Sequence, residues 1–187
     1  MDELIKEGFI ERKHGKGSVV RERRKSLGLL NVKGFSDAVG KNIRTVFLKR
    51  PVISSWSSLV HFRVSKAEKE VPCIFFERLR YVGTDPVMLE SNWIADLGLN
   101  GIVENEFVEG SFFRTLSRNY SIEIIGSEQE IRAEFASNEI AELLQIKTRA
   151  PVLHISVKFK TSQSNLNIYS ELYCNTEKYP IGNTYNI

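Results

Sequence analysis

The sequence predicts an α+β fold in which a few short helices accompany an antiparallel sheet. Several runs of β-forming residues follow one another closely, as at 72–82 and 86–93, with turn-forming residues between them. The helical segments elsewhere are too short to act as regular crossovers between parallel strands. The 187 residues, 42% of them hydrophobic and 26% charged, suit one main domain of about 150 residues with an appendage. We expect the appendage at 1–20, a linker at 21–30 and the main domain at 31–187.

The appendage is predicted to be a short β-hairpin that follows the end of a helix. Residues 1–7 contain the apolar pair Leu4 and Ile5, and Gly8 is placed to end such a helix. Gly15 and Gly17 allow a tight turn and a close approach of the backbone to a partner. The strand-forming residues on either side are Phe9, Ile10, Val19 and Val20. A plain surface turn is the alternative interpretation.

Positive charge is concentrated in the N-terminal arm. The formal net charge of the chain is only +3. Residues 12–25 nevertheless carry seven Lys and Arg residues against a single acid, Glu22. Contact with a polyanion is therefore expected in this arm, and the rest of the chain is expected to be slightly acidic.

The main domain is predicted to open with a strand at 42–48. One face of that strand consists of Ile43, Thr45 and Phe47. Residues 49–71 are predicted to be mostly loop, because Pro51 and several serines interrupt the pattern, with a short helical turn at 65–70.

Two helices and three strands are predicted farther along. Ser111 and Ser137 are each placed to cap a helix with apolar residues on one face. A long strand at 122–135 is expected between these helices. Residues 152–161 and 166–174 are expected to form a final hairpin.

The hairpin formed by the runs at 72–82 and 86–93 carries the candidate binding site. Arg78 and Arg80 are two residues apart and therefore project from one face. If the turn centres on Thr84, Glu90 lies opposite Arg78. Two guanidiniums with one carboxylate suit an anionic ligand that also offers a hydroxyl or an amine. The alternative is a solvated outer face with a weak cross-strand ion pair.

The N-terminal arm resembles the wing of a GntR-type winged helix-turn-helix regulator. The resemblance lies in the order of a helix end, a strand and the sequence Gly15-Lys16-Gly17. In that family about two more helices, including the recognition helix, precede the wing, so residues 1–20 are expected to be only the end of a DNA-binding domain. The residues that the resemblance implies for DNA binding are Arg12, Lys13, Gly15, Lys16, Gly17 and Ser18.

The chain from Gly34 onward, about four fifths of the whole, resembles the UTRA effector-binding domain of the HutC subfamily of GntR regulators. The motifs are Gly34-Phe35-Ser36, Glu77-Arg78-Leu79-Arg80, Pro86 to Glu90, Gly110-Ser111-Phe112-Phe113, Ile131-Arg132-Ala133 and Pro151-Val152-Leu153. The resemblance implies a chorismate-lyase-like fold, a homodimer and a small effector such as a phosphosugar or an amino-acid-derived metabolite. The effector-binding residues that it implies are Arg78, Arg80, Glu90, Ser111, Phe113 and Tyr179.

Some positions depart from the family pattern. Phe113 stands where the family has tyrosine, and Cys174 and Asn175 replace a tyrosine and an arginine. Ile168 stands in place of an acidic residue. A smaller or differently substituted anion than a phosphosugar therefore becomes a candidate effector.

The sequence thus predicts a transcriptional regulator that senses a small anionic metabolite. An enzyme of chorismate-lyase-like fold, acting on a carboxylated substrate, is the alternative, and a protein-interaction domain is a third reading. We expect no cofactor and no metal, because His14, His61 and His154 are scattered and neither Cys73 nor Cys174 has another ligand nearby. A cytoplasmic location without membrane contact is expected, because no signal peptide or long apolar run occurs.

Overall fold

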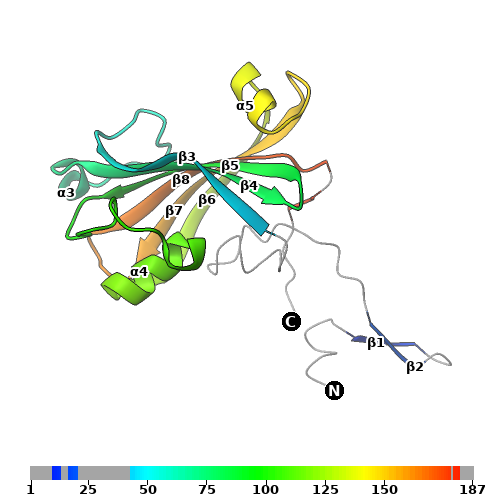
Figure 1. The fold of residues 1–187 in the computed structure, drawn as a ribbon, viewed down its shortest axis with the longest axis horizontal. Helices are drawn as coiled ribbons and strands as arrows, with labels where there is room; N and C mark the ends of the chain where they lie inside the picture. Colours follow the sequence, from blue (N-terminus) through cyan, green and yellow to red (C-terminus); the bar gives the residue numbers. More distant parts are fainter. Residues whose placement is uncertain (1–9, 14–16, 21–42, 178, 182–187) are drawn as a thin grey trace.

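The structure is a computed structural model, and it describes residues 10–13, 17–20, 43–177 and 179–181. Its main feature is a six-stranded antiparallel sheet with the strand order β3-β4-β5-β8-β7-β6 (Figure 1). The strands are β3 (Ile43–Ser54), β4 (Cys73–Val82), β5 (Asp85–Ala95), β6 (Ile124–Phe135), β7 (Pro151–Thr161) and β8 (Asn167–Cys174). The helices are α3 (Lys66–Lys69), the 3-10 turn η1 (Val108–Gly110), α4 (Phe112–Tyr120) and α5 (Asn138–Leu143). The predicted α+β class is therefore confirmed.

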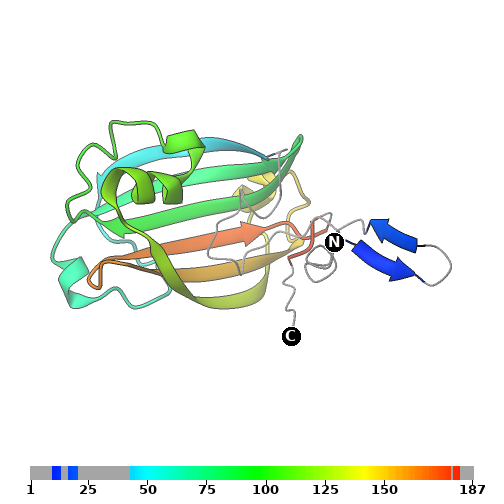
Figure 2. The same ribbon diagram turned by 90° about the horizontal axis from the view of Figure 1, so that it is seen from below.

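Helices α4 and α5 lie on opposite faces of the sheet (Figure 1), and α4 crosses the face that is turned toward the viewer in Figure 2. Both helices begin as the sequence predicts, because the side chains of Ser111 and Ser137 accept hydrogen bonds from backbone amides of the first turn. The face that α4 covers is called the α4 face below.

A separate two-stranded sheet is formed by β1 (Ile10–Lys13) and β2 (Gly17–Val20), with Ile10 opposite Val20 and Lys13 opposite Gly17. This pairing is the predicted hairpin. The predicted helix end at 1–9, the tip at 14–16 and the linker at 21–30 lie outside the described residues.

The β4–β5 hairpin has the predicted register through most of its length. Residues from Cys73 to Arg80 face partners from Ala95 to Met88, and Arg78 lies opposite Glu90. A shift after Arg80 then shortens the turn, in which Gly83 adopts a φ of 62°.

The prediction of a loop from residue 49 onward is wrong for its first part. β3 continues through Pro51 to Ser54, and Val52 lies opposite Phe75. Pro51 is tolerated because β3 is an edge strand and its pairing with β4 is irregular between Phe47 and Val52. The predicted helical turn is present as α3, which Ser65 caps.

The core lies on both sides of the sheet. On the α4 face, the rings of Phe76, Phe107 and Phe112 pack edge to face or tilted, with centroids 4.7 to 5.3 Å apart. On the opposite face, Trp93 and Tyr169 are buried beneath the segment that contains α3.

That segment is tied to the sheet through a buried carboxylate. Glu68 is fully buried and accepts hydrogen bonds from the Tyr169 hydroxyl at 2.7 Å and from the Asn167 backbone amide at 2.8 Å. It also completes a capping box with Ser65.

Candidate functional site

The predicted cluster of Arg78, Arg80 and Glu90 is present on the α4 face. Arg78 Nη2 donates to Glu90 Oε1 at 2.7 Å, and Arg80 Nε donates to Glu90 Oε2 at 2.7 Å. Arg80 Nη1 also donates to Thr45 Oγ1 on the edge strand at 2.9 Å. One carboxylate therefore joins two guanidiniums and fixes the spacing between them.

Burial decides between the two sequence-based interpretations of this cluster. The exposed fractions of Arg78, Arg80 and Glu90 are 2%, 5% and 9%. A solvated outer face is therefore wrong. Phe107, from the loop before α4, lies over Arg78, and α4 itself packs beside the cluster on Phe76 and Ile94. The Arg78 guanidinium lies 4.9 Å from the ring centroid of Phe76 and 5.8 Å from that of Phe107.

The two arginines keep Glu90 ionised. Burial alone would raise the pKa of Glu90, but the charges and hydrogen bonds of the two arginines outweigh it and lower that pKa to about 2. Burial and the charge of Arg80 lower the pKa of Arg78 to about 10, against the attraction of Glu90. At neutral pH the Glu90 carboxylate is therefore negatively charged and the Arg78 guanidinium positively charged.

The cluster does not satisfy all of its own hydrogen-bonding groups. Among the described residues, nothing accepts a hydrogen bond from Arg78 Nε or Nη1, although both atoms are buried. Unpaired buried donors are costly, at about 1–3 kcal/mol each. Their presence beside a charged cluster is typical of a site that completes its hydrogen bonds with a ligand or a buried water.

A neighbouring polar pair on the same face was not predicted from the sequence. Asn92 follows Glu90 by two residues on β5, and Ser170 lies opposite it on β8. Ser170 Oγ donates to Asn92 Oδ1 at 2.6 Å, and both residues are 1% exposed. The sequence signal for Asn92 is the alternation of side chains along a strand, because a residue two positions after Glu90 must share its face.

Ser111 and Phe113 lie at the start of α4. The Ser111 hydroxyl accepts from the Arg114 amide at 3.3 Å and so caps the helix. The ring of Phe113 packs on Phe159 of β7, with centroids 5.0 Å apart. Between them, Phe112 contacts Phe76, which also flanks Arg78, so the helix start is connected to the arginine cluster through aromatic rings.

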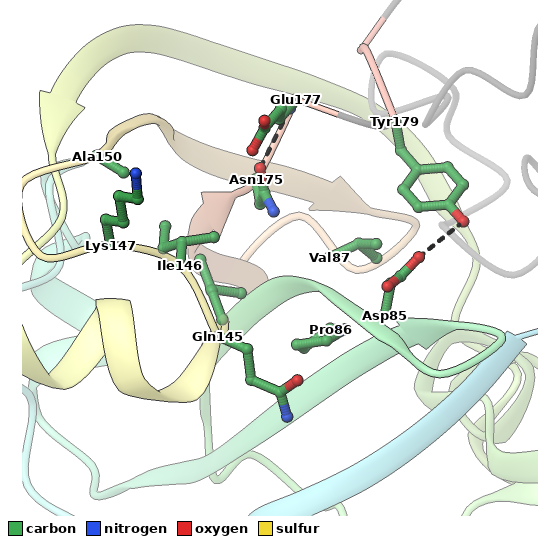
Figure 3. A pocket seen from close by; sticks show the side chains of 11 residues that line it. Asp85, Pro86, Val87, Gln145, Ile146, Lys147, Ala150, Asn175, Glu177 and Tyr179 are labelled. Atoms are coloured by element: carbon green, nitrogen blue, oxygen red, sulfur yellow. Dashed lines mark hydrogen bonds between the residues drawn. The ribbon is translucent and has the colours of Figure 1, made fainter.

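Tyr179 lies near the β4–β5 turn (Figure 3), where its hydroxyl donates to Asp85 Oδ2 at 3.3 Å. It lines a cavity of about 380 Å³. The cavity lining comprises Asp85, Pro86, Val87, Leu144, Gln145, Ile146, Lys147, Ala150, Asn175, Glu177 and Tyr179. The side chain also packs against the apolar cluster that contains Met88, the cross-strand partner of Arg80. Tyr179 thus lies at the end of the sheet, beyond the arginine cluster.

Neither a metal-binding cluster nor a membrane-spanning helix is found in the described part of the chain. Within it, no group of three or more His, Cys, Asp or Glu side chains is arranged to hold a metal ion. The helices of the same part are all too short or too polar to cross a bilayer.

Three comparisons place these features among known proteins. Residues 61–180 match the UTRA domain family. The "Probable fructoselysine utilization operon transcriptional repressor" of Shigella flexneri is 22% identical over 183 residues, which are 95% of this chain and 73% of that protein.

Solved structures show the same fold. The "possible transcriptional regulator YydK" of Bacillus subtilis superposes with a TM-score of 0.71 at 19% identity, over 100% of this chain and 80% of that one. A GntR-family transcriptional regulator of Enterococcus faecalis gives a TM-score of 0.59 at 20% identity, over 76% of this chain and 100% of that one.

Proposed function

The chain belongs to the UTRA domain family, and on that premise we propose that it is the effector-sensing part of a GntR-type transcriptional regulator of the HutC subfamily. A small anionic metabolite binds on the α4 face and changes the affinity of the regulator for its operator DNA. The protein is homologous to proteins named as repressors and regulators, and this favours a binding role over the enzymatic alternative.

The observation that carries this proposal is the buried arginine cluster with unpaired donors. A purely structural ion pair would be expected to satisfy its own hydrogen bonds, because each unpaired donor costs stability. Arg78 instead keeps two nitrogens without partners among the described residues, in a position sealed by aromatic rings. A bound anion would pair with them and would recover that cost. Arg78, Arg80 and Glu90 are therefore the proposed core of the effector site, with Ser111, Phe113 and Tyr179 at its borders.

DNA contact is proposed for the N-terminal hairpin. Strands β1 and β2 pair as a wing would, and the proposed contacts are Arg12, Lys13, Gly15, Lys16, Gly17 and Ser18. Residues 21–30 are the proposed linker through which the domain at 31–187 biases the DNA-binding part. The proposed setting is the cytoplasm, where the operator is found.

A homodimer is proposed through the outer edge of β6. Ile131 and Phe135 are 47% and 67% exposed on this edge strand, which leaves apolar surface uncovered. A twofold antiparallel pairing centred on Ala133 would place Ile131 opposite Phe135 of the second copy and Arg132 opposite Glu134 of the second copy. Phe135→Glu should then convert the dimer to a monomer in light scattering, and a dimer that persists would contradict this interface.

Thermal unfolding with a panel of metabolites tests the sensing role. The panel comprises sugar phosphates, amino acids, small carboxylates and fructoselysine. A ligand at about 100 times its Kd adds roughly 2.7 kcal/mol, which raises the Tm of a chain of this size by about 5–10 °C. The shift should vanish in Arg80→Ala and persist in Arg50→Ala, which removes an exposed ion pair with Glu106 instead. No shift with any compound would contradict effector binding.

A further inference from the structure

Asn92 presents an unpaired donor next to the arginine cluster. Its Nδ2 atom is buried and has no hydrogen-bond partner among the described residues. Its Oδ1 atom accepts a hydrogen bond from Ser170 Oγ of β8 at 2.6 Å, which supports the amide orientation that leaves Nδ2 as the unpaired end. The free end of this amide can therefore bind only a group that accepts a hydrogen bond.

The two sets of unpaired donors are neighbours in the sheet. Asn92 lies opposite Phe76, and Glu90 lies opposite Arg78, so Asn92 and Arg78 are diagonal neighbours on one face. Such neighbours are about 7–8 Å apart, and their Cβ atoms are somewhat closer. A small oxyanion whose oxygens each accept a hydrogen bond of about 2.9 Å can span that separation between two extended side chains.

We infer that the Asn92 amide is a ligand-binding group of the effector site, and that with Arg78 it binds a carboxylate of the effector. This inference rests on the proposed sensing role and specifies the chemistry of the same site. Ser170 is a positioning residue, because it acts on the ligand through the Asn92 amide.

Charge favours a carboxylate over a phosphate. The donors that lack partners are on Arg78, which carries one positive charge, and on Asn92, which carries none. A carboxylate brings one negative charge, which matches the single charge of Arg78, whereas a phosphate carries about −1.5 to −2 at pH 7 and exceeds it. Buried charge without a partner is strongly unfavourable. Asn92 adds a donor without adding charge, as a monoanion site requires.

The unpaired donors of Arg78 and Asn92 are buried, so an anion can reach them only if the groups that bury them move. Phe107 comes from the loop between β5 and α4, is 5% exposed, and has its ring centroid 5.8 Å from Arg78 Cζ. The loop turns at Glu109 and Gly110, whose φ values are 50° and 67°. A positive φ is uncommon in a non-glycine residue such as Glu109 and costs energy. A rearrangement that releases it would offset part of the free energy needed to move Phe107 away from Arg78.

Side-chain NMR of the full chain tests this inference with two probes, sodium acetate and inorganic phosphate, and with sodium chloride as the ionic-strength control. The Asn92 Nδ2 signals are assigned by their loss in Asn92→Leu, and the Nε signal of Arg78 by its loss in Arg78→Lys. Acetate should shift both signals saturably, chloride should shift neither, and phosphate should bind at least about tenfold more weakly. Asn92→Leu should weaken acetate binding about tenfold or more.

Each outcome has a distinct meaning. If acetate shifts Arg78 but not Asn92, or binds equally well to Asn92→Leu, the role of Asn92 is refuted while the sensing role stands. If phosphate binds more tightly than acetate, the carboxylate assignment is refuted. If neither anion shifts either signal, this inference is refuted and the arginine cluster loses its proposed ligand. Should Asn92→Leu fail to fold, Ser170→Ala replaces it, with a smaller loss of acetate affinity expected and an unchanged affinity counting against the inference.

Discussion

Replacing Glu90 with glutamine should strongly destabilise the protein, because it leaves two guanidiniums buried together. Glu90 accepts from both arginines at 2.7 Å and is 9% exposed. Removing one partner from a buried ion pair costs about 3–5 kcal/mol, since the remaining charge is neither solvated nor paired. We therefore expect Glu90→Gln to lower the free energy of unfolding at pH 7 by about 3 kcal/mol or more.

The lowered pKa of Glu90 gives a second way to obtain the expected loss in the free energy of unfolding. It falls from 4.5 to about 2 on folding, and each pKa unit is worth about 1.36 kcal/mol, so the ionised carboxylate contributes about 3 kcal/mol. Because the pKa is lowered in the folded state, this contribution is fully present above pH 4.5 and is lost as the pH falls toward 2. Glu90→Gln should remove this part of the acid dependence.

Urea unfolding followed by tryptophan fluorescence measures both effects, because Trp93 is 3% exposed and reports loss of the core. Glu106→Gln is the matched control, since Glu106 pairs with Arg50 on the surface, where its side chain is 73% exposed. No measurable change is expected for that control. A Glu90→Gln protein that unfolds within about 1 kcal/mol of the wild type at pH 7 would refute the argument that Glu90 is buried and kept ionised by the two arginines.

Two further predictions concern stability and ligand binding. Glu68→Gln should cost about 1–3 kcal/mol in urea unfolding, because an amide cannot accept every hydrogen bond that this buried carboxylate receives, and a loss below about 0.5 kcal/mol would contradict its burial. Ser111→Ala and Ser137→Ala should each cost about 1 kcal/mol as lost helix caps, but only Ser111→Ala should also reduce the effector-induced rise in Tm, and equal effects on that rise would exclude Ser111 from the site.

The sequence was sufficient to predict the hairpin and the cluster within it, because both follow from the period of two in a strand. Arg78, Arg80 and Glu90 come together once the turn is placed. Their burial did not follow, since the sequence does not show which face of the sheet the loop before α4 will cover. The proposed role of Asn92 was missed for the same reason, because its unpaired Nδ2 donor has meaning only when the position is known to be buried.

Long-range contacts explain the other failures. Glu68 looks like part of a charged surface turn, yet it is fully buried through Asn167 and Tyr169, about a hundred positions away. β3 was predicted too short because Pro51 usually ends a strand, and only its place at the edge of the sheet makes it tolerable.

The proposed site is built partly on central strands of the sheet and partly on an irregular loop. Arg78, Glu90, Asn92 and Ser170 stand on β4, β5 and β8, which are central strands paired on both sides. Such strands resist displacement, because moving one breaks two ladders of backbone hydrogen bonds. Phe107 instead comes from a loop whose nearest regular structure is the three-residue η1. We therefore expect a ligand that binds the strands to displace Phe107 with its loop, and α4 next to it, rather than the strands themselves. Variants of Phe107 should accordingly change the coupling between effector and DNA more than they change the folded sheet.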